Sequence, residues 1–220
     1  LNLRLQVYTQ LKDWNELKKL LPILSKNDTI SAEKLVEVEL NLYRSQLNEQ
    51  IKKLSSLPLD EKKAALNKIW AEIPTKIQHR EEILFVYASQ LMTLAEHDSA
   101  EKCLSSALVK QWFDQWIDLY GLLRCSDSKR PLQVAEKWLP KHADSAQLLL
   151  AIGRQCIQNQ QWGRAIDFFE QSIKIQPRTE TFAELARLLD YMNEHEKSHA
   201  YYKLGLMQNS KVLIEGGYYK

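Results

Sequence analysis

Small residues recur at a nearly constant interval along the last two thirds of the chain. Ala88, Gly121, Gly153 and Ala186 are separated by 33, 32 and 33 residues. Two antiparallel helices that cross closely need a small side chain at the crossing point, because a larger one would push the two backbones apart. A constant step of this length is typical of helical hairpins that pack only on their neighbours along the chain.

The clearest repeat unit runs from about Ala146 to Arg178. Its apolar and small residues follow helical spacing: Leu149, Ile152, Gly153, Cys156, Ala165, Phe169 and Ser172, with Pro177 ending the second helix. Nearly every position fits the tetratricopeptide pattern. Only 6 Gly and 6 Pro interrupt the chain, which favours long helices over many short strands. The sequence therefore predicts an all-α fold, a right-handed α-solenoid of tetratricopeptide hairpins.

The solenoid is predicted to cover residues 1–210 and to contain six hairpins. They span residues 1–30, 31–78, 81–113, 114–145, 146–178 and 179–210; the second is expanded and the fourth is short. An irregular tail is predicted at 211–220, where Gly216-Gly217 breaks the pattern. The tryptophans are predicted to pack between hairpins. Trp14 and Trp162 stand at equivalent turns before second helices, and only Trp116, close to a helix start, is left open.

Composition argues against several classes of function. Lys and Arg total 30 against 28 Asp and Glu, and the two signs alternate, so we expect neither a nucleic-acid partner nor a polybasic membrane patch. Cys103, Cys125 and Cys156 fit no disulfide framework or zinc motif. The chain lacks a glycine-rich phosphate loop, a nucleophile elbow and a His-Glu-x-x-His run. We therefore predict a protein that is not an enzyme, with no catalytic residues, no metal and no cofactor.

The first helix of each hairpin in such an array lines the concave side, where an extended or helical partner segment can bind. The predicted groove residues stand at the second, fifth, ninth, twelfth and thirteenth positions of their units: Phe85, Ser89, Met92, Gln147, Arg154, Gln158, Arg187 and Tyr191. Arg154 and Arg187 occupy matching positions of adjacent units. Either they clamp an acidic group of a partner protein, or each pairs with a neighbouring acid such as Asp190 or Glu184.

His195 and His199 stand four residues apart, on one face of the predicted last helix. Such a pair is able to ligate a metal or haem iron, although no third ligand lies nearby in the sequence. These two histidines are the candidate ligands of an alternative function, a haem or porphyrin carrier. A second alternative is a self-assembling adaptor, in which the groove receives another copy of the chain as a homo-oligomer.

Several passages are similar to one known family over roughly residues 1–207. They include Trp70-Ala-Glu-Ile-Pro74, Leu108-Val-Lys-Gln-Trp112, Leu148-Leu-Leu-Ala-Ile-Gly153 and Gln161-Trp162-Gly-Arg-Ala165. The chain resembles the carboxy-terminal tetratricopeptide half of the HemY-like proteins, inner-membrane proteins of protohaem IX biogenesis in Gram-negative bacteria. This resemblance implies two transmembrane helices upstream, repeats on the cytoplasmic face, and a scaffold linked to haem biosynthesis with haem-pathway enzymes as partners.

The chain begins at Leu1 inside an apolar-periodic stretch and without a capping residue. We therefore expect it to be a fragment of a longer protein, with any membrane anchor upstream. No segment approaches the length of uncharged apolar sequence that spans a bilayer, so the fragment itself is expected to be soluble.

Overall fold

The protein is described from a computed structural model, which covers residues 2–26, 30–53 and 58–215. Every regular element in these ranges is a helix, as the repeat pattern predicts. The chain divides into two compact units, unit 1 at Leu1–Cys103 and unit 2 at Leu104–Lys220. No helix within the described ranges is both long enough and apolar enough to cross a membrane.

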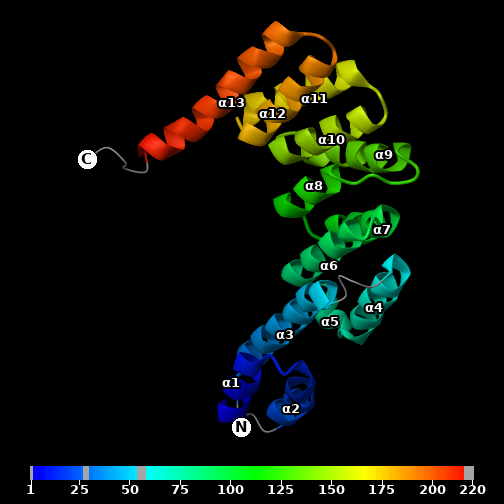
Figure 1. Cartoon of the computed structure of the whole chain (residues 1–220), viewed down its shortest axis with the longest axis vertical. Coiled ribbons are helices and arrows are strands. Elements are labelled where there is room, and N and C mark those ends of the chain that lie inside the picture. The colour runs from blue at the N-terminus through cyan, green and yellow to red at the C-terminus, as the bar shows by residue number, and fades with distance from the viewer. Residues whose placement is uncertain (1, 27–29, 54–57, 216–220) are drawn as a thin grey trace. The chain divides into compact units, whose positions relative to one another are not determined.

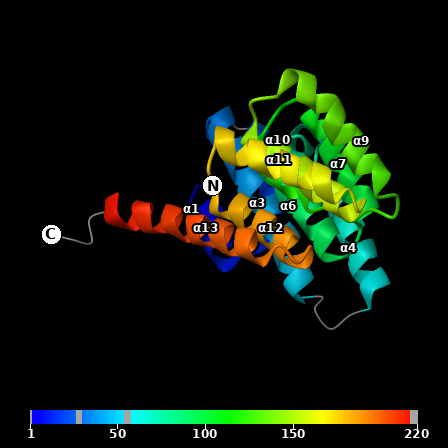
Figure 2. The same cartoon turned by 90° about the horizontal axis from the view of Figure 1, so that it is seen from above.

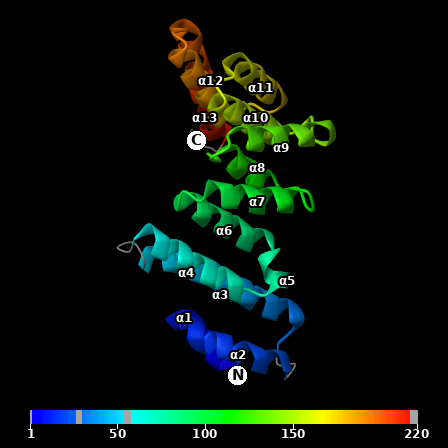
Figure 3. The same ribbon diagram turned by 90° about the vertical axis from the view of Figure 1, so that its right-hand side faces the viewer.

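Unit 1 is built around one long helix. Its elements are α1 (Asn2–Leu11), α2 (Trp14–Lys26), α3 (Ala32–Lys53), α4 (Leu59–Glu72), α5 (Thr75–Gln78), α6 (Glu81–Thr93) and the start of α7 (His97–Leu108). Helix α3 packs against α2, α4, α5 and α6, and Figures 1 and 3 show α3 and α4 side by side. Leu17, Leu24, Leu42 and Leu47 are almost completely buried. These leucines form the apolar core of the first two hairpins.

Unit 2 contains more regular hairpins. After the end of α7 come α8 (Asp114–Gly121), α9 (Lys129–Trp138), the short 3₁₀ helix η1 (Leu139–Lys141), α10 (Ala146–Gln158), α11 (Trp162–Ile175), α12 (Thr179–Tyr191) and α13 (His195–Glu215). Helix α10 packs against α8, α9 and α11, and α12 packs against α11 and α13. Figure 2 shows the α10–α11 and α12–α13 hairpins as neighbouring pairs.

Four hairpins turn in the same way. Lys12, Ala95, Gln160 and Asn193 each have a positive φ, between 54° and 64°. In the α10–α11 turn, the N–H of Gln160 donates to the carbonyl of Ile157, and the N–H of Gln161 donates to that of Cys156. The same bonds recur at the other three turns. This is the Schellman geometry, which ends one helix and sets where the next begins.

Small residues lie where the helices of unit 2 meet. A Cβ added to Gly153 would stand 2.6 Å from Cδ1 of Phe169, and one added to Gly121 would stand 2.8 Å from Cα of Ala151. Ser172 is buried and its hydroxyl donates to the carbonyl of Ala146 at 2.8 Å. These contacts are the physical reason for the repeated small residues in the sequence.

The structure corrects one expectation, the irregular tail, and resolves one open position, Trp116. The irregular tail predicted from residue 211 is wrong for 211–215, because α13 continues to Glu215. The helix persists since consecutive breakers first occur at Gly216-Gly217, which lie outside the described residues. Trp116, whose position was left open, is a core residue, with 2% of its surface exposed.

Candidate protein-binding groove

Two adjacent cavities lie along the first helices of the unit 2 hairpins. One, of about 180 Å³, is lined by Gly121, Leu122, Arg124, Arg154, Ile157, Gln158 and Glu184. The other, of about 440 Å³, is lined by Ile157, Trp162, Glu184, Arg187, Leu188 and Tyr191. Both are lined by Ile157 and Glu184, so the two cavities adjoin, and together we call them the unit 2 groove.

The apolar end of the unit 2 groove is built around an aromatic pair. The Schellman turn at Gln160 makes Trp162 the first residue of α11, next to the last turn of α12. The Trp162 and Tyr191 ring centroids are 5.4 Å apart. Leu188 is buried beside them, whereas Tyr191 is 71% exposed. This end therefore presents an open aromatic surface over an apolar base, which is suited to an apolar side chain.

Positive side chains outnumber negative ones in the unit 2 groove. The Glu184 carboxylate accepts from Nε of Arg154 at 3.0 Å and lies 3.1 Å from Nη2 of Arg187. One carboxylate thus serves two guanidinium groups. Arg124 also lines the groove, is exposed, and forms no ion pair with any residue that the structure describes. Three cations against one anion leave the groove with an excess of positive charge, which favours anionic ligands.

Buried polar contacts hold the walls of the groove in place. The Gln155 side-chain amide donates to the carbonyls of Tyr120, Gly121 and Leu123, which ties α10 to the end of α8. Arg178, at the start of α12, makes a bidentate pair with Asp118 of α8 at 2.9 and 3.0 Å. The hydrogen bonds to Asp118 raise the pKa of Arg178.

The structure brings together four of the predicted groove residues. Arg154 and Gln158 line the smaller cavity, and Arg187 and Tyr191 line the larger one. Gln147 lines neither of these two cavities, and its amide lies 3.5 Å from that of Gln176. Of the two interpretations of the arginine pair, pairing with a neighbouring acid applies, because Glu184 contacts both Arg154 and Arg187. A single carboxylate, however, does not neutralise both arginines.

Phe85, Ser89 and Met92, the remaining predicted groove residues, lie on α6 of unit 1. All three are half-buried. The Ser89 hydroxyl donates to the carbonyl of Phe85 within its own helix, at 2.7 Å. They belong to a different compact unit from the other five, so their part in partner binding stays a prediction.

The two histidines lie at the start of α13. His195 is its first residue, and its Nδ1 is 2.8 Å from a carboxylate oxygen of Asp190. Both imidazoles are exposed. Within the described ranges, no three His, Cys, Asp or Glu side chains are grouped closely enough to hold a metal ion. Haem or metal ligation by His195 and His199 stays a prediction.

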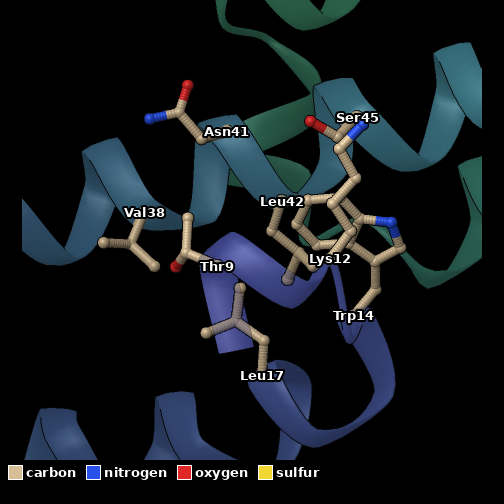
Figure 4. Close-up of a pocket in the computed structure, with 8 residues that line it drawn as sticks. All are labelled: Thr9, Lys12, Trp14, Leu17, Val38, Asn41, Leu42 and Ser45. Carbon is tan, nitrogen blue, oxygen red and sulfur yellow. The ribbon is translucent and has the colours of Figure 1, made fainter. Parts of the chain in front are cut away.

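Unit 1 carries a cavity of its own, of about 270 Å³ (Figure 4). It is lined by Thr9, Lys12, Trp14, Leu17, Val38, Asn41, Leu42 and Ser45. Residues of α3 form one side, and residues of α1, α2 and their turn form the other. We call this cavity the unit 1 pocket.

Sequence reasoning missed several lining residues. Ile157 stands at the twelfth position of its unit. This is one of the positions that define the predicted groove, yet Ile157 was not among the predicted residues. Trp14 and Trp162 were predicted to be packing residues, but both are half-buried and line cavities. The only available signal for them was their equivalent place before second helices. Arg124 follows the end of α8 in an irregular segment, where the repeat pattern offers no signal.

Comparisons with solved structures define the class of protein. A tetratricopeptide repeat protein from Parabacteroides merdae superposes with a TM-score of 0.56, with 16% identity, covering 93% of this chain and 77% of that one. A thermophilic tetratricopeptide protein of Thermus thermophilus gives 0.52, also at 16% identity, covering 78% and 93%. The fold is that of a tetratricopeptide repeat protein, which confirms the predicted all-α architecture.

In sequence, the chain is similar to Protein HemY of Escherichia coli K12. The two are 22% identical over 209 residues, which cover 94% of this chain and 50% of the relative. The HemY proteins of Escherichia coli O157:H7 and Shigella flexneri match equally well. The resemblance to HemY-like proteins is thus confirmed, and the chain spans about half the length of the curated relatives it matches. No protein-family model matches the chain.

Proposed function

We propose that this chain is a scaffold without enzymatic activity, which binds partner proteins through the unit 2 groove. The observation that carries the proposal is the composition of the groove: an open aromatic end formed by Trp162 and Tyr191 adjoins a stretch with three arginines and one glutamate. Apolar anchors beside charged groups are the usual chemistry of peptide recognition.

The partner segment is acidic and carries an apolar side chain. Its carboxylate pairs with Arg124 and with the Nη atoms of Arg154, whose Nε is already engaged by Glu184. Guanidinium groups bind carboxylates with two parallel hydrogen bonds, so an arginine outside an intramolecular pair is a strong anchor. The apolar side chain enters between Trp162, Leu188 and Tyr191. The partner's conformational entropy is the main cost of binding.

The similarity to HemY supports a cellular context for the scaffold. We infer that it acts in haem biosynthesis at the bacterial inner membrane, with haem-pathway enzymes among its partners. In the full-length protein the repeats lie on the cytoplasmic face, below an upstream anchor. A soluble repeat region there would gather enzymes close to the membrane.

Affinity capture tests the groove. The immobilised chain is incubated with a detergent extract of Gram-negative membranes, and bound proteins are quantified by mass spectrometry. Arg124→Glu and Arg154→Glu reverse charges in the groove. Lys174→Glu, an exposed change of the same sign on α11, is the control. We expect both groove variants to capture roughly tenfold less partner protein than the control does. Partners that all three variants retain equally would refute the assignment.

The carrier alternative rests on the two exposed imidazoles of α13. A haem titration of the purified chain would then give a saturable Soret shift, which His195→Ala or His199→Ala abolishes. The self-assembly alternative predicts sedimentation coefficients that rise with protein concentration and that Arg124→Glu lowers. A titration without saturable change, or sedimentation independent of concentration, removes the respective alternative.

A further inference from the structure

The unit 1 pocket and the larger cavity of the unit 2 groove are the same structural position in two different hairpins. Six lining residues correspond one to one. Thr9, Trp14, Val38, Asn41, Leu42 and Ser45 match Ile157, Trp162, Glu184, Arg187, Leu188 and Tyr191, in that order. The tryptophan follows the first residue by five positions in both sets, and the last four residues of both sets have the spacing i, i+3, i+4 and i+7, one face of a helix.

The hairpin turn explains why this position is hollow. Lys12 and Gln160 hold the same positive-φ Schellman turn, and two residues later Trp14 and Trp162 begin their second helices. Each indole therefore stands at the corner of its hairpin, facing the first helix of the next one. Leu42 is buried completely and Leu188 almost completely, and both form the base of their cavities.

The base of the unit 1 pocket is apolar. Leu17 and Leu42 are 1% and 0% exposed. The indole N–H of Trp14 donates to Glu49 at 2.9 Å, which fixes the orientation of the ring, and Lys12 lies 3.4 Å from the other Glu49 oxygen. The one charged side chain in the pocket lining is thus neutralised by a carboxylate outside it.

The polar part of the unit 1 pocket differs from its counterpart. Val38 and Asn41 stand where the unit 2 groove has Glu184 and Arg187, so the central charges are absent. Asn41 accepts from Arg44 through its Oδ1, at 2.9 Å. In the part of the chain that the structure describes, its amide N–H₂ and the hydroxyl of Ser45 have no hydrogen-bond partner. Such groups are suited to the neutral carbonyls of a peptide backbone.

We propose that the unit 1 pocket is a second recognition site, which takes one uncharged apolar side chain, such as Leu, Ile, Met or Phe, from a segment of a partner protein. A volume of about 270 Å³ over the apolar base of Leu17 and Leu42 has room for such a side chain. The lack of net charge in the lining selects a segment without acidic residues next to the anchor. This site is separate from the groove of the proposed function and does not depend on it.

Peptide selection tests the unit 1 pocket. Random peptides displayed on phage are selected against the complete chain, and the enriched peptides are measured against Ser45→Trp and Trp162→Ala. Ser45→Trp places an indole in the unit 1 pocket from a half-buried position of α3, and thermal unfolding checks that the variant is folded. We expect one class of peptides, with an apolar anchor and uncharged flanks, to bind Ser45→Trp at least roughly tenfold more weakly, and to bind Trp162→Ala normally.

A charge exchange gives a second test of the unit 1 pocket. Val38→Glu combined with Asn41→Arg gives the unit 1 pocket the polar pair of unit 2, and should change the preference of this peptide class towards charged flanks. The proposal is overturned if no peptide depends on Ser45, or if the peptides that do are as acidic as those lost on Trp162→Ala. If the selection yields no acidic peptide that depends on Trp162, the proposed function of the unit 2 groove fails and the unit 1 site still stands.

Discussion

At the scale of single residues, the two glycines of the α10–α11 hairpin have opposite roles. Gly153 faces the ring of Phe169, whereas a Cβ at Gly163 would meet no atom within 4 Å. We expect Gly153→Ala to lower the free energy of unfolding by about 1–3 kcal/mol, because the core is already full. Gly163→Ala should raise it by roughly 0.5–1 kcal/mol through helix propensity. Urea denaturation measures both, and equal effects would contradict this account of the crossing point.

Cys156 is a packing residue, and its chemistry should show it. It is 0% exposed, and burial raises the pKa of its thiol to about 11. At pH 8 about a thousandth of it is thiolate, the reactive form. We expect iodoacetamide to modify the half-buried Cys125 well before Cys156 in the native protein, and both alike in urea. Mass spectrometry of the alkylated peptides decides this.

The same burial has a consequence for stability at high pH. The folded pKa of Cys156 is above that of the unfolded chain, so folding favours the protonated thiol. This contribution is fully present below pH 9 and is lost as pH rises towards about 11. Cys156→Ala should flatten the decline in unfolding midpoint over that range, which scans at several pH values would show.

At the scale of elements, the residues at the hairpin turns differ in how well they suit a positive φ. Ala95 has a φ of 59° and Asn193 a φ of 64°. Alanine is strained in the left-handed region, whereas asparagine tolerates it and glycine is free of the penalty. We expect Ala95→Gly to raise the free energy of unfolding by roughly 0.5–1 kcal/mol and Asn193→Gly to change it less. Chemical denaturation would rule this out if Ala95→Gly destabilised the protein.

At the scale of the whole molecule, some side-chain contacts join segments that lie far apart in the sequence. The pair of Arg178 with Asp118 is the clearest, since it links α8 to α12 within unit 2 across 60 residues. Both side chains are largely buried, at 20% and 31% exposure. We expect Arg178→Ala to cost about 1 kcal/mol and to loosen the unit 2 groove. A double-mutant cycle with Asp118→Ala should give a coupling energy that falls with added salt, and a coupling near zero would refute the link.

Much of the fold could be predicted from the spacing of a few residues. The repeated small residues, with Phe169 and Pro177, place the hairpins because helix crossings are local and periodic. Half of the predicted groove residues line the unit 2 groove for the same reason: first-helix positions follow from the repeat. The role of Trp162 could not be predicted, because burial of an indole at a hairpin corner depends on the next hairpin.

The sequence by itself determined the helical repeat, its turns and the near balance of charge, since these follow from periodicity and composition within one unit. Only the tertiary structure decided that Glu184 serves two arginines, that Arg124 joins them from an irregular segment, and that Trp14 and Trp162 line matching cavities. Each of these depends on side chains from different hairpins meeting in space. A one-dimensional pattern specifies the face of a helix but not which neighbour fills the space beside it.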